Sequence, residues 1–235
     1  MRVNETLTFA EYALRFYAGL ARKQLQVPPG FKILNPFTKE QIMQVTRAFY
    51  EKYYHDTHKR RMILGSSPAR LGSAQTGIPF EDGNFLETIT GFPLEKRHGN
   101  RSSSDFMEDV KRKYGGRAAF YATFYMNFVC PLGVAGVTAA GREVNCNYYE
   151  NKTLRYTLRP FMVDALREQM EFGIDVSVCY CIGSGENYQF LSQLNAEYGF
   201  FRRIVPLPHP RFIMQYHAKQ KDEFLKYYLD TLCAK

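Results

Sequence analysis

The alternation of helical and strand patterns along this chain is the feature that most constrains how it can fold. Apolar residues at helical spacing, bounded by capping residues or glycine, predict helices, and short β-branched and aromatic runs predict buried strands. Parallel strands need a crossover, usually a helix, to bring the chain back. We therefore expect an α/β fold, a three-layer αβα arrangement around a central, mainly parallel four-stranded sheet. The expected helices cover about 8–25, 39–54, 103–114, 158–172, 186–198 and 219–232, and the expected strands about 61–65, 118–129, 175–182 and 201–207.

The loops that follow these strands carry the residues most able to bind a ligand. They begin at Ser66, near Asn127, at Gly183 and at Pro208. The carboxyl ends of parallel strands meet at one edge of a sheet, and ligands bind at that edge in open α/β folds. The pattern therefore predicts a binding site at this edge.

Composition sets further bounds on the chain. With 235 residues, 45% of them hydrophobic, it can form one core, and we expect a single domain over 1–235 with a helical N-terminal region at about 1–58. The formal net charge of +8 suits an anionic partner such as DNA, although many basic proteins never bind nucleic acid. No apolar run is long enough for a membrane span, and the N-terminus lacks a signal-peptide pattern. We expect a cytoplasmic, monomeric protein that does not contact membranes.

Cysteine and histidine usage gives no metal pattern. The five cysteines are an odd number and include no CxxC pair, which argues against a disulfide framework or a zinc ribbon. His55 and His58 lack an evident third ligand and fit a solvated, basic helix end. We therefore predict no metal and no cofactor.

The segment from Ile63 to Asp82, ILGSSPARLGSAQTGIPFED, is the most informative stretch of the sequence. Its small residues let backbone N–H groups approach a ligand closely. Together with two later segments, it resembles the single-strand-selective monofunctional (SMUG-type) branch of the uracil-DNA glycosylase superfamily. The resemblance rests on AQTGIPF at 74–80, MNFVCPL at 126–132 and LPHPR at 207–211; residues 1–60 and 136–158 contribute nothing to it.

This resemblance implies a uracil-DNA glycosylase-like fold and an enzyme of base excision repair. Such an enzyme flips a damaged base out of single- or double-stranded DNA and hydrolyses its N-glycosidic bond. It is expected to be monofunctional, since no lysine occupies a motif position from which to form a Schiff base. The sequence leaves open which base is preferred, uracil or a related lesion, and which strand form.

The resemblance also implies roles for individual residues. His209 would donate toward a carbonyl oxygen of the departing base, and Arg211 with Phe212 would contact DNA. The base itself would be bound by three residues, of which Phe80 stacks on its ring, Asn127 reads its edge through the side-chain amide, and Ser66 lies in the loop beneath it.

The chain departs from the family pattern at Ser67. The SMUG-type motif carries Gly-x-Asn-Pro, whose asparagine positions the attacking water, whereas this sequence reads Gly65-Ser66-Ser67-Pro68. A serine hydroxyl can still hydrogen-bond water, with a shorter reach and one donor instead of two. We therefore predict a catalytic role for Ser67, with a slower reaction or a shifted substrate preference.

Two other functions fit parts of the sequence. One is an α/β enzyme that binds a nucleotide or cofactor, such as a methyltransferase, with the loop from Gly65 to Gly72 around the ligand. That function calls for an acidic residue near the end of the second strand, where Asn127 stands instead. The other is a DNA-binding relative that lost its chemistry when serine replaced the asparagine.

Overall fold

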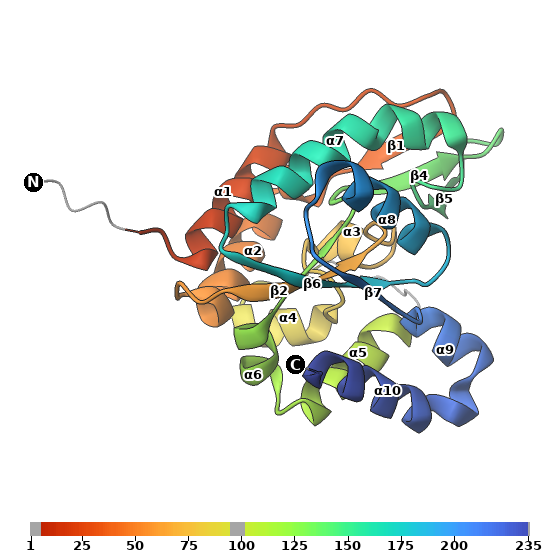
Figure 1. Ribbon diagram of the computed structural model, residues 1–235. Coiled ribbons are helices and arrows are strands. Elements are labelled where there is room, and N and C mark those ends of the chain that lie inside the picture. The colour runs from red at the N-terminus through yellow and green to blue at the C-terminus, as the bar shows by residue number, and fades with distance from the viewer. Residues whose placement is uncertain (1–5, 95–101, 235) are drawn as a thin grey trace, which may run out of the picture.

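The computed structural model describes residues 6–94 and 102–234, and it confirms the expected α/β class (Figure 1). Four parallel strands form the central sheet in the order β3-β2-β6-β7. Their side chains are largely buried because helices cover both faces. The strands are β2 (Arg60–Gly65), β3 (Phe124–Phe128), β6 (Ile174–Ile182) and β7 (Ile204–Leu207).

Helices form the two outer layers (Figure 1). On one side of the sheet lie α1 (Phe9–Ala21), α7 (Lys152–Met170) and α8 (Glu186–Tyr198). On the other lie α5 (Ser102–Lys113), α6 (Arg117–Thr123), α9 (Pro210–Tyr216) and α10 (Lys221–Cys233). α2 (Glu40–Tyr54) packs against α1 and against α4 (Gly83–Thr90). The short helices are α3 (Ser73–Thr76) and two 3-10 turns, η1 (Pro36–Thr38) and η2 (Ala218–Gln220).

A second, three-stranded antiparallel sheet is a feature that the sequence patterns did not predict. Its order is β1-β4-β5, with β1 at Phe31–Leu34, β4 at Gly133–Val137 and β5 at Glu143–Cys146. β1 lies within the N-terminal region that we expected to be helical, and it pairs with β4 through Leu34 and Gly133. The N-terminal region is thereby joined to a strand that begins shortly after β3.

The structure corrects the predicted strand over 118–129. Its first half is helix α6, and only Phe124–Phe128 forms a strand. The aromatic residues of this run suggested a strand, but its alanines favour helix, and Ala118, Ala119 and Ala122 face solvent.

The patterns Thr8-x-x-Glu11 and Thr38-x-x-Gln41 in the sequence each predict a capping box at a helix start, and the two predictions had different outcomes. The capping box between Thr8 and Glu11 is present at α1. The second capping box, predicted from Thr38, does not form, because Thr38 ends a 3-10 turn capped by Asn35, and α2 begins at Glu40 without a side-chain cap. None of the helices in the described residues is both long and apolar enough to cross a membrane.

Candidate functional site

A cavity of about 530 Å³ opens at the carboxyl edge of the central sheet. Its walls come from the loop after β2, from the start of α5, from the residues around the end of β5, and from α9. Six of the seven predicted site residues line it, namely Ser66, Ser67, Phe80, His209, Arg211 and Phe212. The fold thus brings together side chains that lie as much as 146 positions apart, from 66 to 212.

Two stacked aromatic rings form one side of the cavity. The Phe80 and Phe128 ring centroids lie 5.4 Å apart, with an angle of 27° between the planes. Gly65, at the end of β2, makes room for them, since a Cβ there would lie 2.8 Å from the Phe128 ring and 3.0 Å from the Phe80 ring. We call Phe80, Phe128, Glu81 and Lys111 the stacking side of the cavity.

The backbone of Phe80 adopts a conformation that is rare for a bulky residue. Its φ is +56°, in the left-handed region, which costs about 1–3 kcal/mol and persists only where the surroundings enforce it. The Lys111 ammonium donates a hydrogen bond to the Phe80 carbonyl oxygen at 3.2 Å and also contacts the Glu81 carboxylate. These contacts fix the peptide group between Phe80 and Glu81.

Lys111 and Glu81 form an ion pair inside the protein. Their side chains are 0% and 1% exposed, and the Glu81 carboxylate also accepts a hydrogen bond from the Tyr121 hydroxyl. Burial lowers the pKa of Lys111, and the Glu81 charge acts against that shift. Glu81 lines the cavity, and its carboxylate is engaged in these contacts. Asp82 is also engaged, since it caps α4 through the backbone N–H groups of Asn84 and Phe85.

Hydroxyl and amide groups form another side of the cavity. The Ser66 and Ser67 hydroxyls both donate to Asn147 Oδ1, at 3.0 and 3.2 Å. Asn147 in turn donates from its backbone N–H and from Nδ2 to Glu150 Oε1, at 3.0 and 2.7 Å. We call the three cavity-lining residues Ser66, Ser67 and Asn147, together with Glu150, which does not line the cavity, the polar side.

Sequence reasoning missed the two asparagines of this region, Asn145 and Asn147. Both line the cavity, and Asn145 Oδ1 accepts a hydrogen bond from the Arg70 N–H at 2.8 Å. They lie in the segment 136–158, which contributes nothing to the family resemblance. The available signal was weak: two asparagines two positions apart, Asn145 within the short strand β5 and Asn147 directly after it.

His209 enters the cavity from the start of α9. Its Nδ1 accepts a hydrogen bond from the Arg211 N–H at 3.1 Å, so the neutral ring carries its proton on Nε2. Burial, with a smaller contribution from the Arg211 charge, lowers the pKa of His209 to about 4. At neutral pH the ring is therefore an uncharged N–H donor facing the cavity, and Nε2 has no partner among the described residues.

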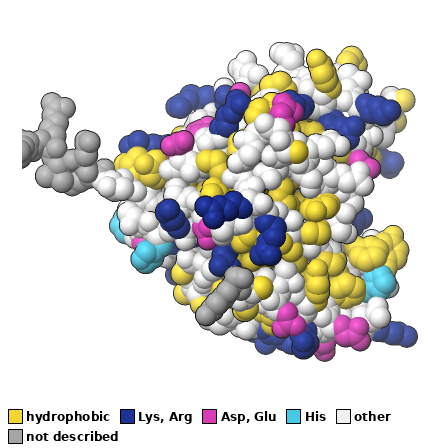
Figure 2. Space-filling view, viewed as in Figure 1, with side chains coloured by type: hydrophobic (Ala, Val, Ile, Leu, Met, Phe, Trp, Pro, Cys, Tyr) yellow, Lys and Arg dark blue, Asp and Glu magenta, His cyan; other side chains and the backbone are white. Residues whose placement is uncertain are grey.

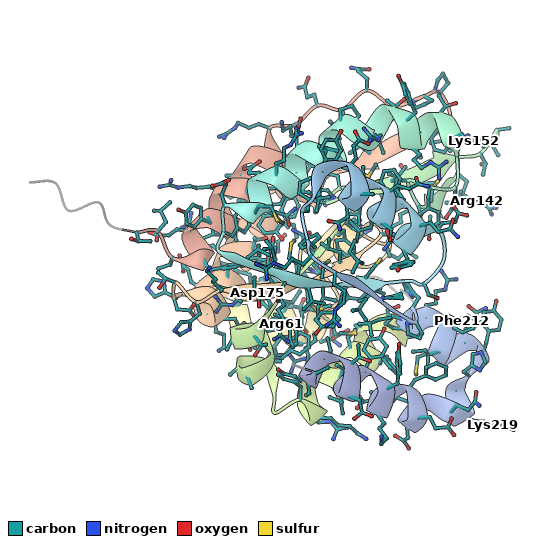
Figure 3. All side chains as sticks on the ribbon, in the orientation of Figure 1. Arg61, Arg142, Lys152, Asp175, Phe212 and Lys219 are labelled. Carbon is teal, nitrogen blue, oxygen red and sulfur yellow. The ribbon has the colours of Figure 1, made fainter. Side chains whose placement is uncertain are left out.

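The mouth of the cavity is cationic and apolar. Phe212 and Tyr216 are 46% and 67% exposed, and their rings lie 5.7 Å apart. Figure 2 shows the hydrophobic side chains gathered over α9, and in Figure 3 Phe212 lies at the other end of the sheet from Arg61 and Asp175. Arg70 and Arg211 also line the cavity, and neither forms an ion pair with a described residue.

Asn127 is the predicted site residue that does not line the cavity. Alternation along β3 turns its side chain to the opposite face from Phe128. There Nδ2 donates to the Tyr125 hydroxyl at 2.7 Å and to Gln169 Oε1 at 2.6 Å, and Oδ1 accepts from the Phe128 N–H at 2.9 Å. The structure therefore corrects the prediction that Asn127 reads a base, and Phe128 occupies the cavity wall in its place.

Cysteine and acidic side chains do not form a metal site in the part of the chain that the structure describes. No group of three or more His, Cys, Asp or Glu side chains there could hold an ion. All five cysteines are free thiols, and only Cys233 is exposed.

Comparisons with known proteins identify the family of the chain and a similar solved structure. The family model described as "Uracil DNA glycosylase superfamily" matches residues 51–233. Among solved structures, the chain is similar to wild-type SMUG2 of Pedobacter heparinus, with 41% identity and a TM-score of 0.89. That match covers 96% of this chain and 97% of the other. No curated protein sequence matched the chain.

Proposed function

Because the chain belongs to the uracil-DNA glycosylase superfamily, we propose that it is a monofunctional DNA glycosylase that hydrolyses the N-glycosidic bond of uracil or a related damaged base. The observation that carries the proposal is the uncharged His209 ring, which presents an Nε2–H donor to a cavity walled by stacked aromatic rings. The cavity volume falls in the range typical of ligand sites.

Breaking the glycosidic bond leaves negative charge on the departing base, and His209 is suited to stabilise it. A donor fixed in a site shielded from water is typically worth about 3–4 kcal/mol in the transition state. A neutral imidazole also adds no positive charge to the cavity at neutral pH. The Phe80 ring would stack on the flipped base, with Ser66 beside it in the loop after β2.

The attacking water would be held on the polar side. Ser67 stands where the related motif has asparagine, and its hydroxyl lines the cavity. Among the described residues no lysine lines the cavity to form a Schiff base, which supports hydrolysis by water without a covalent intermediate.

DNA would approach at the mouth, where Arg70 and Arg211 lack ion-pair partners among the described residues. Unpaired arginines are suited to phosphate contacts, and an exposed aromatic such as Phe212 can fill the space left by a flipped nucleotide. The partner is then single- or double-stranded DNA that contains the lesion. Membership of the superfamily removes the support for a methyltransferase, and a relative without chemistry is an outcome that the assay below decides.

An excision assay on a uracil-containing oligonucleotide tests the proposal. Wild-type protein should release uracil, and His209→Ala should reduce the rate by at least about a hundredfold while DNA affinity changes little. His58→Ala is the matched control, since His58 is exposed and does not line the cavity. Absence of release from uracil and from oxidised or deaminated bases would contradict a glycosylase, and full activity of His209→Ala would contradict the role of His209.

A further inference from the structure

Asn147 occupies an unusual position for a residue that follows a strand of the small sheet. Its Oδ1 accepts hydrogen bonds from two serine hydroxyls, Ser66 and Ser67, at the carboxyl end of β2. A hydroxyl has one proton and two lone pairs. Because the Ser67 proton is directed at Asn147, only lone pairs of Ser67 Oγ remain for contacts within the cavity.

The amide of Asn147 is itself fixed in orientation. Its Nδ2 donates to Glu150 Oε1 at 2.7 Å, and its backbone N–H donates to the same oxygen at 3.0 Å. A carboxylate accepts hydrogen bonds and donates none, so the nitrogen end of the amide faces Glu150 and the oxygen end faces the serines. Hydrogen bonds in such a chain also polarise one another, which makes Oδ1 a stronger acceptor.

We propose that Asn147 is a positioning residue that makes Ser67 a hydrogen-bond acceptor for the attacking water. The inference rests on the proposed glycosylase function and deepens it. In this role Asn147 supplies the amide that the related motif carries at the position of Ser67. The Asn147 amide acts on the water through the Ser67 hydroxyl, so serine can stand in place of the asparagine.

The step balances without a further reactant. The water oxygen forms a bond to C1′ of the sugar while the C1′–N bond breaks. The electron pair of the C1′–N bond leaves with the base. His209 donates a hydrogen bond to the base anion, which takes up a proton from solvent after release. The water loses one proton to solvent, and Ser67 accepts a hydrogen bond from it without being protonated.

A double-mutant cycle on single-turnover excision tests the coupling between the two residues. Asn147→Ala should slow excision roughly tenfold, as expected for one orienting hydrogen bond, with little change in DNA affinity. Adding Asn147→Ala to Ser67→Ala should cause no further loss, because Asn147 acts through the hydroxyl. Losses that multiply in the double variant would overturn the proposal.

Asn151→Ala is the matched control for stability. Asn151 lies in the same loop and caps α7 by accepting from the Leu154 N–H, but it does not line the cavity. Its loss should lower the melting temperature, since a lost cap costs about 1 kcal/mol, and leave the excision rate unchanged. An equal loss of rate in this variant would mark the effect of Asn147→Ala as structural.

Substitutions at Glu150 test the orientation of the amide without touching the cavity wall. Glu150→Gln keeps an oxygen acceptor and should retain most of the activity, whereas Glu150→Ala should resemble Asn147→Ala. Equal activity of the two variants would contradict the proposal. This comparison also holds if Asn147→Ala fails to fold.

Crystal structures of wild type and Asn147→Ala provide a readout that needs no activity. A water within hydrogen-bond distance of Ser67 Oγ should be present in the first and displaced in the second. If wild type releases no base but this water behaves as expected, the glycosylase proposal fails and the positioning role stands. If wild type releases uracil and Asn147→Ala matches it, the positioning role alone fails.

Discussion

The stacking side and the polar side of the cavity are built on different principles. On the stacking side, a buried ion pair holds the strained peptide of Phe80, and Lys111 and Glu81 are almost inaccessible to water. On the polar side, a chain of hydrogen bonds ends at Glu150, which is exposed. Changes to the stacking side therefore act on folding and activity together, whereas changes to the polar side should act mainly on the rate.

The largest effect should come from breaking the buried ion pair. Lys111→Met leaves the Glu81 carboxylate buried without its main counter-charge, which typically costs about 3–5 kcal/mol of the free energy of unfolding. It also removes the hydrogen bond to the Phe80 carbonyl oxygen. Chemical denaturation measures the first effect, and single-turnover excision measures the second.

A paired substitution separates stability from positioning. Lys111→Met combined with Glu81→Leu removes both charges, and the free energy of unfolding should recover most of the loss. Excision should stay below wild type, because nothing then holds the Phe80 carbonyl. Full recovery of activity would show that the ion pair serves stability alone, and the contrast between the two sides would disappear.

The next effect concerns the polar side, at Ser67. Ser67→Ala should reduce excision about tenfold and change the melting temperature little, since the loss is one hydrogen bond at the cavity wall. Ser67→Asn should retain or raise activity by restoring the amide of the related motif. If Ser67→Ala equals wild type on uracil and on other lesions, the water is positioned elsewhere.

A smaller effect is expected at the mouth. Arg211→Ala should weaken binding to a lesion in a duplex several-fold more than to one in a single strand, because only the duplex leaves a gap to fill. Affinity should fall with salt, by a slope of roughly 0.7–0.9 per phosphate contacted. Arg61→Ala is the control, since Arg61 lies at the other end of the sheet (Figure 3). Equal losses on both DNA forms would identify Arg211 as a phosphate contact only.

The smallest expected effect is that of pH on His209. Its pKa in the folded protein, about 4, lies below the ordinary value, so the unfolded chain binds more protons between about pH 6.5 and 4. The contribution of the neutral His209 ring to the free energy of unfolding is thus complete above about pH 6.5 and declines as the pH falls from about 6.5 to about 4. Excision between pH 7 and 8 should show no change caused by this histidine. A pH–rate profile with an inflection near 6.5 that His209→Ala abolishes would contradict the low pKa.

The sequence predicted β2, β6 and β7 close to their observed bounds because they are apolar runs separated by clear helix signals, whereas the strand predicted over 118–129 is half helix. Helix α8 was predicted with the bounds it has, Glu186–Tyr198, since Gly199 ends it in the left-handed conformation. The small sheet escaped prediction because its strands are four or five residues long and β4, with the sequence GVAGV, carries two glycines. Strands of this kind gain their stability from pairing across the chain, which local patterns do not contain.

The predicted site residues reached the cavity where a motif fixes local backbone geometry, as at Ser66, Ser67, Phe80 and His209. Asn127 did not, because a single position along a strand decides which face a side chain takes. Asn147 had only a weak sequence signal. The position of Asn147 depends on the pairing of β5 with β4, and the sequence of these two short strands does not predict that they pair.

The pairing of β1 with β4 has a consequence for where the protein can be cut. The family model begins at residue 51, yet Phe31–Leu34 supports β4, which supports β5 and the asparagines that follow. A fragment that starts at residue 51 would contain every side chain of the cavity and still lose the outer strand that braces its polar side. The part of the chain that supports the candidate site is thus longer than the region that the family model matches, and we expect an N-terminal truncation to disturb the site from a distance.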